Sequence, residues 1–268
     1  MAIFHSGSEG QSQKLTVLRR RQRLLLFRAR LLPPICWALS VLTALWWFPP
    51  LKDALSADVR FRAWVIVALF TVLLSAPVLV SFRLKRRAKG AKYAATLVSS
   101  GIHGEEDARA MLERLPNSVH VYPNRIVHAG NRSECDLVAL TRRGATIIEV
   151  KNHAGRVTGD YSDHDLLLTR KNGDPLTFYN PVMQVTTHAQ TLARAIADGG
   201  VPSPVKKCVM FVREGTEVKL TDRFHAHRTT PVFTRRNRFR LRFLILHRGK
   251  RLRRREFRQL CRLLEDMK

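Results

Sequence analysis

The stretch DLVALTRRGATIIEVK, residues 136–151, decides the fold of this 268-residue chain. Its two apolar runs flank the polar residues TRRG, and this pattern predicts two antiparallel strands joined by a tight turn. Whether the turn has two residues or four, Val138 faces Ile147 in the expected register. The same register brings Asp136 opposite Glu149, with Cβ atoms about 5 Å apart.

Lys151 lies two residues beyond Glu149, so both side chains project from the same face of the strand. Opposed carboxylates repel, and either a lysine or a divalent cation would compensate. Mg²⁺ is typically held by one or two carboxylates, with water and phosphate oxygens completing its shell. A lysine beside such an ion stabilises developing phosphate charge. Asp136, Glu149 and Lys151 together therefore suit metal-assisted hydrolysis of a phosphodiester.

A structural interpretation of the same residues competes with this one. Asp136 would then be a turn residue, and Glu149 with Lys151 an ion pair on a solvated strand. The apolar residues at 147, 148 and 150 instead predict a strand buried on both faces, where unpaired carboxylates are costly. A functional site is favoured. We expect three nearby histidines to be polar surface residues: His153, His164 and His188.

The surrounding sequence predicts one α/β or α+β domain over residues 101–268. Helices are expected at 101–115, at 180–197 and near the C-terminus, where the spacing of apolar residues is helical. Short β-like runs are expected as strands at 119–122, 166–170, 207–212, 230–233 and 238–246. The four cysteines have no CxxC spacing, which argues against a zinc module and a disulfide framework.

Two stretches near the N-terminus contain no charged residue. Residues 31–48 and 63–82 are each long enough to cross the hydrocarbon core, which needs roughly 20 residues. Bases are concentrated before the first stretch and after the second, within residues 1–30 and 83–100. The positive-inside rule therefore predicts a multi-pass cell-membrane protein with an external loop at 49–62 and both termini in the cytoplasm. Residues 83–100 are expected to be a basic linker.

The formal net charge of +26 indicates a polyanionic partner, either nucleic acid or an anionic membrane surface. The bases are densest in residues 235–255, where no acidic residue interrupts them. As a strand, RFRLRF would place its arginines on one face and its apolar side chains in the core. We expect a phosphate-binding stripe, although anionic lipid is an alternative partner: Arg235, Arg236, Arg238, Arg240, Arg242, Arg248, Lys250, Arg251, Arg253, Arg254 and Arg255.

Four sequence motifs in order resemble the nuclease-related domain, NERD, of the PD-(D/E)xK nuclease superfamily. They are G-x-x-G-E at 101–105, S-E-x-D at 133–136, I-I-E-V-K-N at 147–152 with Gly155 downstream, and N-P-x-x-Q at 180–184. The resemblance covers roughly residues 100–200. It implies a restriction-endonuclease-like mixed sheet flanked by helices, here preceded by the predicted transmembrane hairpin.

The resemblance also implies roles for individual residues. Asp136 and Glu149 would be the principal ligands of Mg²⁺ or Mn²⁺, and Glu105 on the first helix would be an additional acid at the metal site. Lys151 would be the catalytic lysine. Gln184, at the start of the next long helix, would contact the site or the nucleic acid.

Two functions follow from these observations. The first is a membrane-anchored, metal-dependent nuclease that hydrolyses DNA, in preference to RNA, at the cytoplasmic membrane face. The second is a non-catalytic membrane tether that binds nucleic acid or a partner protein through the same fold. The complete set Asp136, Glu149 and Lys151 favours the nuclease, because a pure binding module has no need of opposed carboxylates.

Overall fold

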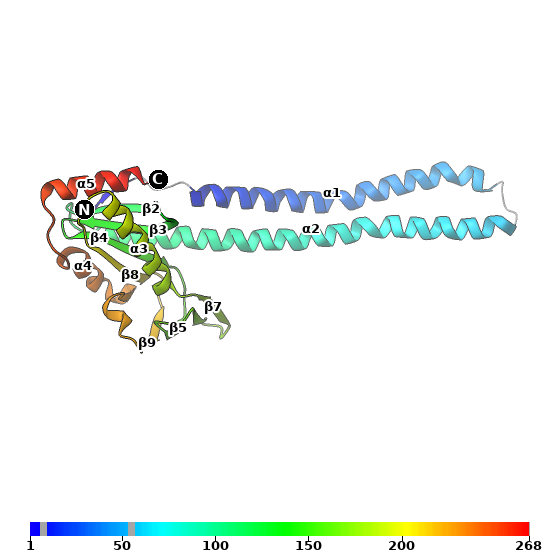
Figure 1. Cartoon of the computed structure of the whole chain (residues 1–268). Coiled ribbons are helices and arrows are strands. Elements are labelled where there is room, and N and C mark those ends of the chain that lie inside the picture. The colour runs from blue at the N-terminus through cyan, green and yellow to red at the C-terminus, as the bar shows by residue number, and fades with distance from the viewer. Residues whose placement is uncertain (6–9, 53–56, 268) are drawn as a thin grey trace. The chain divides into compact units, whose positions relative to one another are not determined.

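A computed structural model describes residues 1–5, 10–52 and 57–267. It describes the backbone alone at residues 10, 11, 36, 39–52, 57–77 and 227. The chain divides into two compact units, one comprising Met1–Gln11 and Ser100–Lys268 and the other comprising Ser12–Ser99 (Figure 1).

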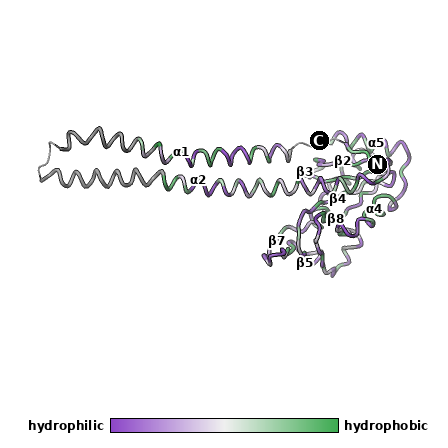
Figure 2. Tube along the Cα trace, turned by 180° about the vertical axis from the view of Figure 1, so that it is seen from behind, coloured by the Kyte–Doolittle hydropathy of each residue, from purple (hydrophilic) through white to green (hydrophobic). Residues whose placement is uncertain are grey.

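The Ser12–Ser99 unit consists of two long helices, which lie side by side in opposite directions (Figure 2). They belong to α1 (Gly10–Lys52) and α2 (Ala57–Leu112), and the last turns of α2 belong to the other unit. Ala29 and Ala88 are buried here, and small side chains of this kind allow close packing of helices. Residues 83–100, expected as a linker, lie within α2.

Among the residues that the structure describes, no helix is both long and apolar enough to cross a membrane. The predicted spans 31–48 and 63–82 lie in α1 and α2. Most of their side chains, at position 36 and positions 39–77, lie outside the described part of the chain.

The larger unit is built on a mixed six-stranded sheet of order β1-β2-β3-β4-β8-β10. β2, β3 and β4 are antiparallel neighbours, while β1 pairs with β2, β4 with β8, and β8 with β10 in parallel. The strands are β1 (Ile3–Phe4), β2 (His120–Ala129), β3 (Asn131–Thr141), β4 (Gly144–Lys151), β8 (Val205–Phe211) and β10 (Val232–Thr234).

A second sheet of four strands has the order β7-β6-β5-β9. β5, β6 and β7 form an antiparallel meander, and β9 pairs with β5 in parallel. Its strands are β5 (Arg156–Asp160), β6 (Asp165–Thr169), β7 (Pro175–Tyr179) and β9 (Glu217–Thr221).

Helices cover both faces of the six-stranded sheet. On one face, α3 (Pro181–Asp198) and α5 (Arg254–Asp266) contribute Leu192 and Leu260 to a core that includes Ile147. On the other face, the end of α2 and α4 (Arg238–His247) pack against the side of β4 that carries Ile148. Two single-turn 3₁₀ helices, η1 (Ala226–Arg228) and η2 (Arg235–Asn237), lie between β9 and α4. The result is a mixed α+β fold with a curled sheet flanked by helices, as the sequence predicted for this part of the chain.

The predicted hairpin is confirmed as β3 and β4. Val138 pairs with Ile147, and Thr141 pairs with Gly144, so the turn has two residues. Gly144 has φ +97°, and a Cβ there would lie 2.3 Å from the carbonyl oxygen of Pro204. β4 is buried on both faces along almost its whole length, as its apolar composition predicted.

The predicted strand over residues 238–246 is wrong. These residues form the helix α4, in which Leu241, Leu244 and Ile245 are buried. Their spacing of three and four residues is the helical pattern, and it outweighs the strict alternation of arginine and apolar residues at 238–243. Because one side of a helix faces solvent, Phe239 and Phe243 are exposed rather than in the core.

The first residues of the chain form a strand that the sequence did not predict. Ile3 and Phe4 in β1 pair with His120 and Val121 at the edge of β2. Two residues are too few to produce a recognisable pattern of alternation, so this pairing becomes evident only in three dimensions.

Candidate active site

The middle of β3 and the end of β4 bring two carboxyl groups together. The regular pairing of these strands stops at Leu137 and Ile148, one residue before Asp136 and Glu149. Asp136 Oδ2 instead accepts a 2.8 Å hydrogen bond from the backbone N–H of Val150. Glu149 is fully buried, whereas Asp136 keeps some surface open to solvent. The predicted juxtaposition of the two acids is present, and it is open on the Asp136 side.

Lys151 links the carboxyl pair to α3. Its Nζ donates a 2.7 Å hydrogen bond to Glu149 Oε1 and a 2.9 Å hydrogen bond to Gln184 Oε1. The Lys151 side chain is 19 % exposed, so its ammonium group is held by these contacts but is not sealed from solvent. Three of the residues expected at a site therefore lie in direct contact: Glu149, Lys151 and Gln184.

The carboxyl pair has perturbed acidity. Burial and the neighbouring Glu149 charge raise the pKa of Asp136 to about 8. Burial also raises the pKa of Glu149, while Lys151 opposes that rise. Because the two carboxyl groups interact in a desolvated setting and the pKa of Asp136 lies above 7, the pair retains a proton at neutral pH. A cation bound here would displace that proton.

The last turns of α2 approach the end of β4 closely at Gly104. A Cβ on Gly104 would lie only 2.7 Å from Cβ of Asn152, so no larger residue fits without a shift. Asn152 also donates a 2.8 Å hydrogen bond to the carbonyl oxygen of Ser100. This packing places Glu105 where its charge raises the pKa of Glu149. The first motif thus brings Glu105 within electrostatic reach of Glu149.

The N-P-x-x-Q motif begins α3 and aims it at the site. The Asn180 side chain accepts a hydrogen bond from the backbone N–H of Val182 and donates to the carbonyl oxygens of Tyr161 and Asp163. Asn180 is therefore both the helix cap and a clamp on the β5–β6 turn. One turn later, Gln184 reaches Lys151. The motif positions Gln184 because Asn180 fixes where α3 begins, and Gln184 lies in the first turns of that helix.

His188 is a site residue that the sequence did not predict. It lies one turn after Gln184 on α3 and is only 14 % exposed, so its expected surface location is wrong. Its Nδ1 shares a 2.7 Å hydrogen bond with Ser133 Oγ, and its Nε2 lies 3.7 Å from Glu149 Oε2. Burial and Lys151 lower the pKa of His188. The spacing of 184 to 188, one helical turn, was the signal that could have identified it.

The other two histidines differ from each other. His164 is 75 % exposed, as expected for a surface residue. His153 is half-buried against the ring of Phe178, and burial together with Lys151 and Arg170 lowers its pKa to about 4. Its expected surface location is wrong because its ring packs against Phe178 of β7 in the second sheet.

Within the described residues, no group of three or more His, Cys, Asp and Glu side chains is arranged to hold a metal ion. Two carboxylates are nevertheless sufficient for Mg²⁺, because water and substrate oxygens complete its shell. Glu149 Oε2 is buried and has no hydrogen-bond partner in this part of the chain. A buried acceptor without a donor is costly, and a cation between Glu149 and Asp136 would satisfy it. The donor set therefore fits Mg²⁺ or Mn²⁺.

The basic residues of 235–255 follow η2, α4 and the start of α5 rather than a strand. Arg235 is partly buried and lies 3.5 Å from Glu214, while the other ten bases of the predicted stripe are exposed. They are spread around the helical surfaces, so the single arginine face that a strand would present is absent from this described segment.

Residues 100–212 match the family of nuclease-related domains, NERD. No curated protein and no solved structure gives a significant match to the chain. The matched segment contains the end of α2, the β3–β4 hairpin and α3, which are the three elements that assemble the site. Residues 100–212 thus match a nuclease-related domain, and Glu149, Lys151 and Gln184 from its motifs meet beside Asp136.

Proposed function

We propose that this protein is a divalent-metal-dependent nuclease that hydrolyses phosphodiester bonds in nucleic acid. One observation carries the proposal: Lys151 bridges Glu149 and Gln184 directly beside Asp136, on one face of the sheet. These residues come from the β3–β4 hairpin and from α3, and all lie within the segment that matches nuclease-related domains. Clusters of perturbed titratable groups of this kind are typical of active sites.

In this proposal Asp136 and Glu149 hold Mg²⁺ or Mn²⁺, with Glu105 as an additional acid close by. The bound cation would supply Lewis-acid activation of the phosphate and would lower the pKa of a bound water. Asp136 is the open ligand, because it keeps exposed surface through which substrate oxygens can enter. Glu149 is the anchored ligand, held by Lys151 at 2.7 Å.

The positive charge of Lys151 would stabilise the negative charge that develops on the reacting phosphate. Attack of water forms one P–O bond and breaks another, and negative charge increases on the phosphate oxygens that remain. The Lys151 ammonium group has a third donor position beyond its bonds to Glu149 and Gln184. That donor is available for a phosphate oxygen or for the attacking water. Gln184 acts as a positioning residue, since it holds Lys151 from the side of α3.

The exposed bases of η2, α4 and α5 suit the polyanionic substrate. Arginine contacts to phosphates give affinity without sequence preference, and this affinity decreases with salt. We propose DNA as the preferred substrate and RNA as the less favoured one.

The direct test is incubation of the full-length protein with end-labelled DNA and RNA, with Mg²⁺, with Mn²⁺ and with EDTA. The proposal expects cleavage only with the divalent ions. A second function competes with it, because Lys151 already neutralises Glu149 without any metal. In that case the fold is a non-catalytic tether, which would bind labelled DNA and leave it intact under every condition.

We also propose that the chain is anchored in the cell membrane by residues 31–48 and 63–82, with the nuclease domain on the cytoplasmic side. The support is the absence of charge in both stretches and the bases on their flanks. Single cysteines introduced at residues 10 and 160 should be protected from an impermeant thiol reagent in intact cells. Labelling of either position from outside would contradict this orientation.

A further inference from the structure

A pocket lined by arginines lies on the opposite face of the sheet from the carboxyl pair. It has a volume of about 210 Å³ and lies between the end of α2 and the segment formed by η2 and α4. Its apolar lining, from Leu112, Leu115 and Leu241, belongs to the core on the Ile148 side of β4. Glu149 follows Ile148 in the strand and therefore projects from the other side. The pocket is distinct from the candidate active site.

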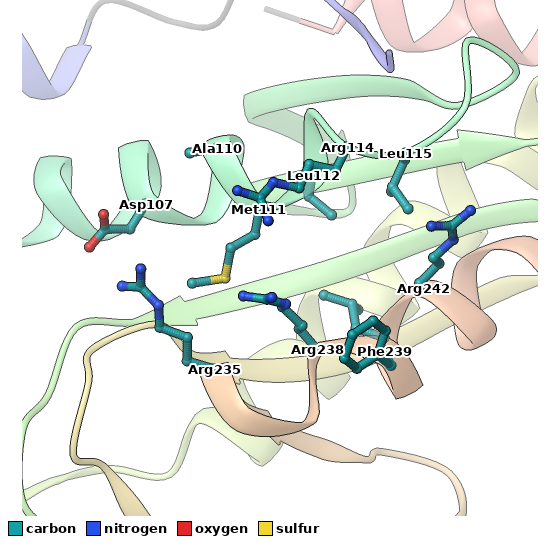
Figure 3. A pocket seen from close by; sticks show the side chains of 11 residues that line it. Asp107, Ala110, Met111, Leu112, Arg114, Leu115, Arg235, Arg238, Phe239 and Arg242 are labelled. Atoms are coloured by element: carbon teal, nitrogen blue, oxygen red, sulfur yellow. The ribbon is translucent and has the colours of Figure 1, made fainter.

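Four arginines surround this cavity: Arg114 after α2, Arg235 in η2, and Arg238 and Arg242 in α4. In Figure 3, Arg235 and Arg238 extend toward α2, and Met111 extends toward them from the opposite wall. Of the described residues that line the pocket, Asp107 alone carries a carboxylate. Among the described residues, no carboxylate forms an ion pair with Arg114, Arg238 or Arg242, although Arg235 approaches Glu214 at 3.5 Å. The pocket therefore has an unneutralised positive charge.

Beside these arginines, the pocket is lined by aliphatic side chains and one aromatic ring. Met111 and the leucines form part of its lining, and Phe239 is 72 % exposed at its edge. Arg238 packs over the Phe239 ring at 5.6 Å, so guanidinium and aromatic surfaces are combined at one position. Phosphate recognition by arginine together with stacking of a base on an aromatic side chain is the chemistry of single-stranded nucleic-acid binding.

We propose that this pocket binds a terminal nucleotide that carries a phosphomonoester, with the phosphate among the arginines and the base against Met111 and Phe239. A phosphomonoester carries about −1.5 to −2 charge at neutral pH, which matches several arginines better than a single internal diester does. A cavity of this size accommodates the phosphate of one nucleotide, with its base against the exposed Phe239 ring, and not a duplex. The proposal extends the proposed nuclease function, since phosphodiester hydrolysis produces strand ends with such phosphates.

The test is calorimetric titration of the full-length protein, without divalent metal, with 5′-AMP, 3′-AMP, adenosine and inorganic phosphate. At least one of the nucleotides should bind about tenfold or more tightly than inorganic phosphate, because base and phosphate both contribute. The double variant Arg238→Ala/Arg242→Ala should lose this binding. The matched control is Arg194→Ala, because Arg194 is an exposed arginine of α3 that neither lines the pocket nor belongs to the basic segment 235–255.

Three results would overturn the proposal. They are equal binding of phosphate and nucleotide, equal loss of binding in Arg194→Ala, and stronger competition by monomeric short-chain phosphatidic acid, which would indicate a lipid headgroup. Circular dichroism should show unchanged folding in the variants, because these exposed arginines form no ion pairs with described residues. The titration needs neither metal nor cleavage, so an inactive protein that still binds nucleotide would refute only the nuclease proposal.

Discussion

The two faces of the six-stranded sheet carry charge in opposite ways. On the α3 face, Asp136, Glu149 and Lys151 are largely enclosed, and each contacts a defined partner. On the α4 face, the arginines are mostly exposed and surround a pocket in which, among the described residues, only Arg235 forms an ion pair with a carboxylate. Enclosed charge depends on a few short contacts, so a single substitution should have a large effect. Exposed charge acts through the summed field of many residues, so its removal should have a gradual effect.

The largest effect is expected from Lys151→Ala on the enclosed face. Loss of the ammonium group should reduce divalent-dependent cleavage by about 10²–10³-fold, as removal of one transition-state donor does. Stabilisation of the protein by Mn²⁺ should remain, because the carboxyl pair is intact. The control is Lys207→Ala, since Lys207 also contacts α3, through Thr186 Oγ1 at 2.9 Å, but lies away from the carboxylates. Similar losses in both variants would indicate that the substitution acts on packing.

A smaller, graded effect is expected on the exposed face. Reversing Arg238, Arg240 and Arg242 to Glu should weaken binding of all nucleic-acid sequences alike. The slope of log K against log salt should decrease by about one for each phosphate that the protein no longer neutralises. Fluorescence anisotropy with labelled single strands at several salt concentrations measures both quantities. Binding that does not change with salt in the parent protein would contradict a role for these arginines in phosphate recognition.

These two faces also differ in how well the sequence predicted them. The β3–β4 register was predicted because a buried strand constrains its residues from both sides, whereas a role for Gln184 at the site was implied only by the family resemblance. α4 was predicted as a strand because arginine and apolar residues alternate over residues 238–243, which is the pattern of a strand with one exposed face. The contact between His188 and Ser133 was not predicted, since it joins residues 55 positions apart through the docking of α3.

Gly104→Ala should test how the end of α2 is held against the site. Alanine normally stabilises a helix relative to glycine by about 1 kcal/mol. At Gly104 the added Cβ would lie 2.7 Å from Asn152, and overpacking of this kind costs about 1–3 kcal/mol. Gly90→Ala is the matched control in the same helix, because no atom lies within 4 Å of a Cβ there. Thermal unfolding should show opposite shifts; stabilisation by both would show that Gly104 is not closely packed.

A separate effect concerns the pH dependence of stability. The pKa of Asp136 in the folded protein, about 8, lies above the ordinary value of 3.8, so the folded state binds more protons between these values. The free energy of unfolding of the metal-free protein should therefore be largest at low pH within this window and decrease as pH rises toward 8. Asp136→Asn should flatten this dependence. A parent and variant with parallel pH profiles of Tm would contradict the shared proton.

Whether Asp136 and Glu149 form a metal-binding catalytic pair is tested most directly by Glu149→Gln. The amide keeps the shape and can still accept from Lys151, but it removes the charge that a cation needs. We expect Mn²⁺ to raise the Tm and to activate cleavage in the parent, and to do neither in the variant, whose metal-free stability is no lower than that of the parent. A variant that retains metal-dependent cleavage, or a parent that neither cleaves nor responds to metal, would contradict the catalytic pair.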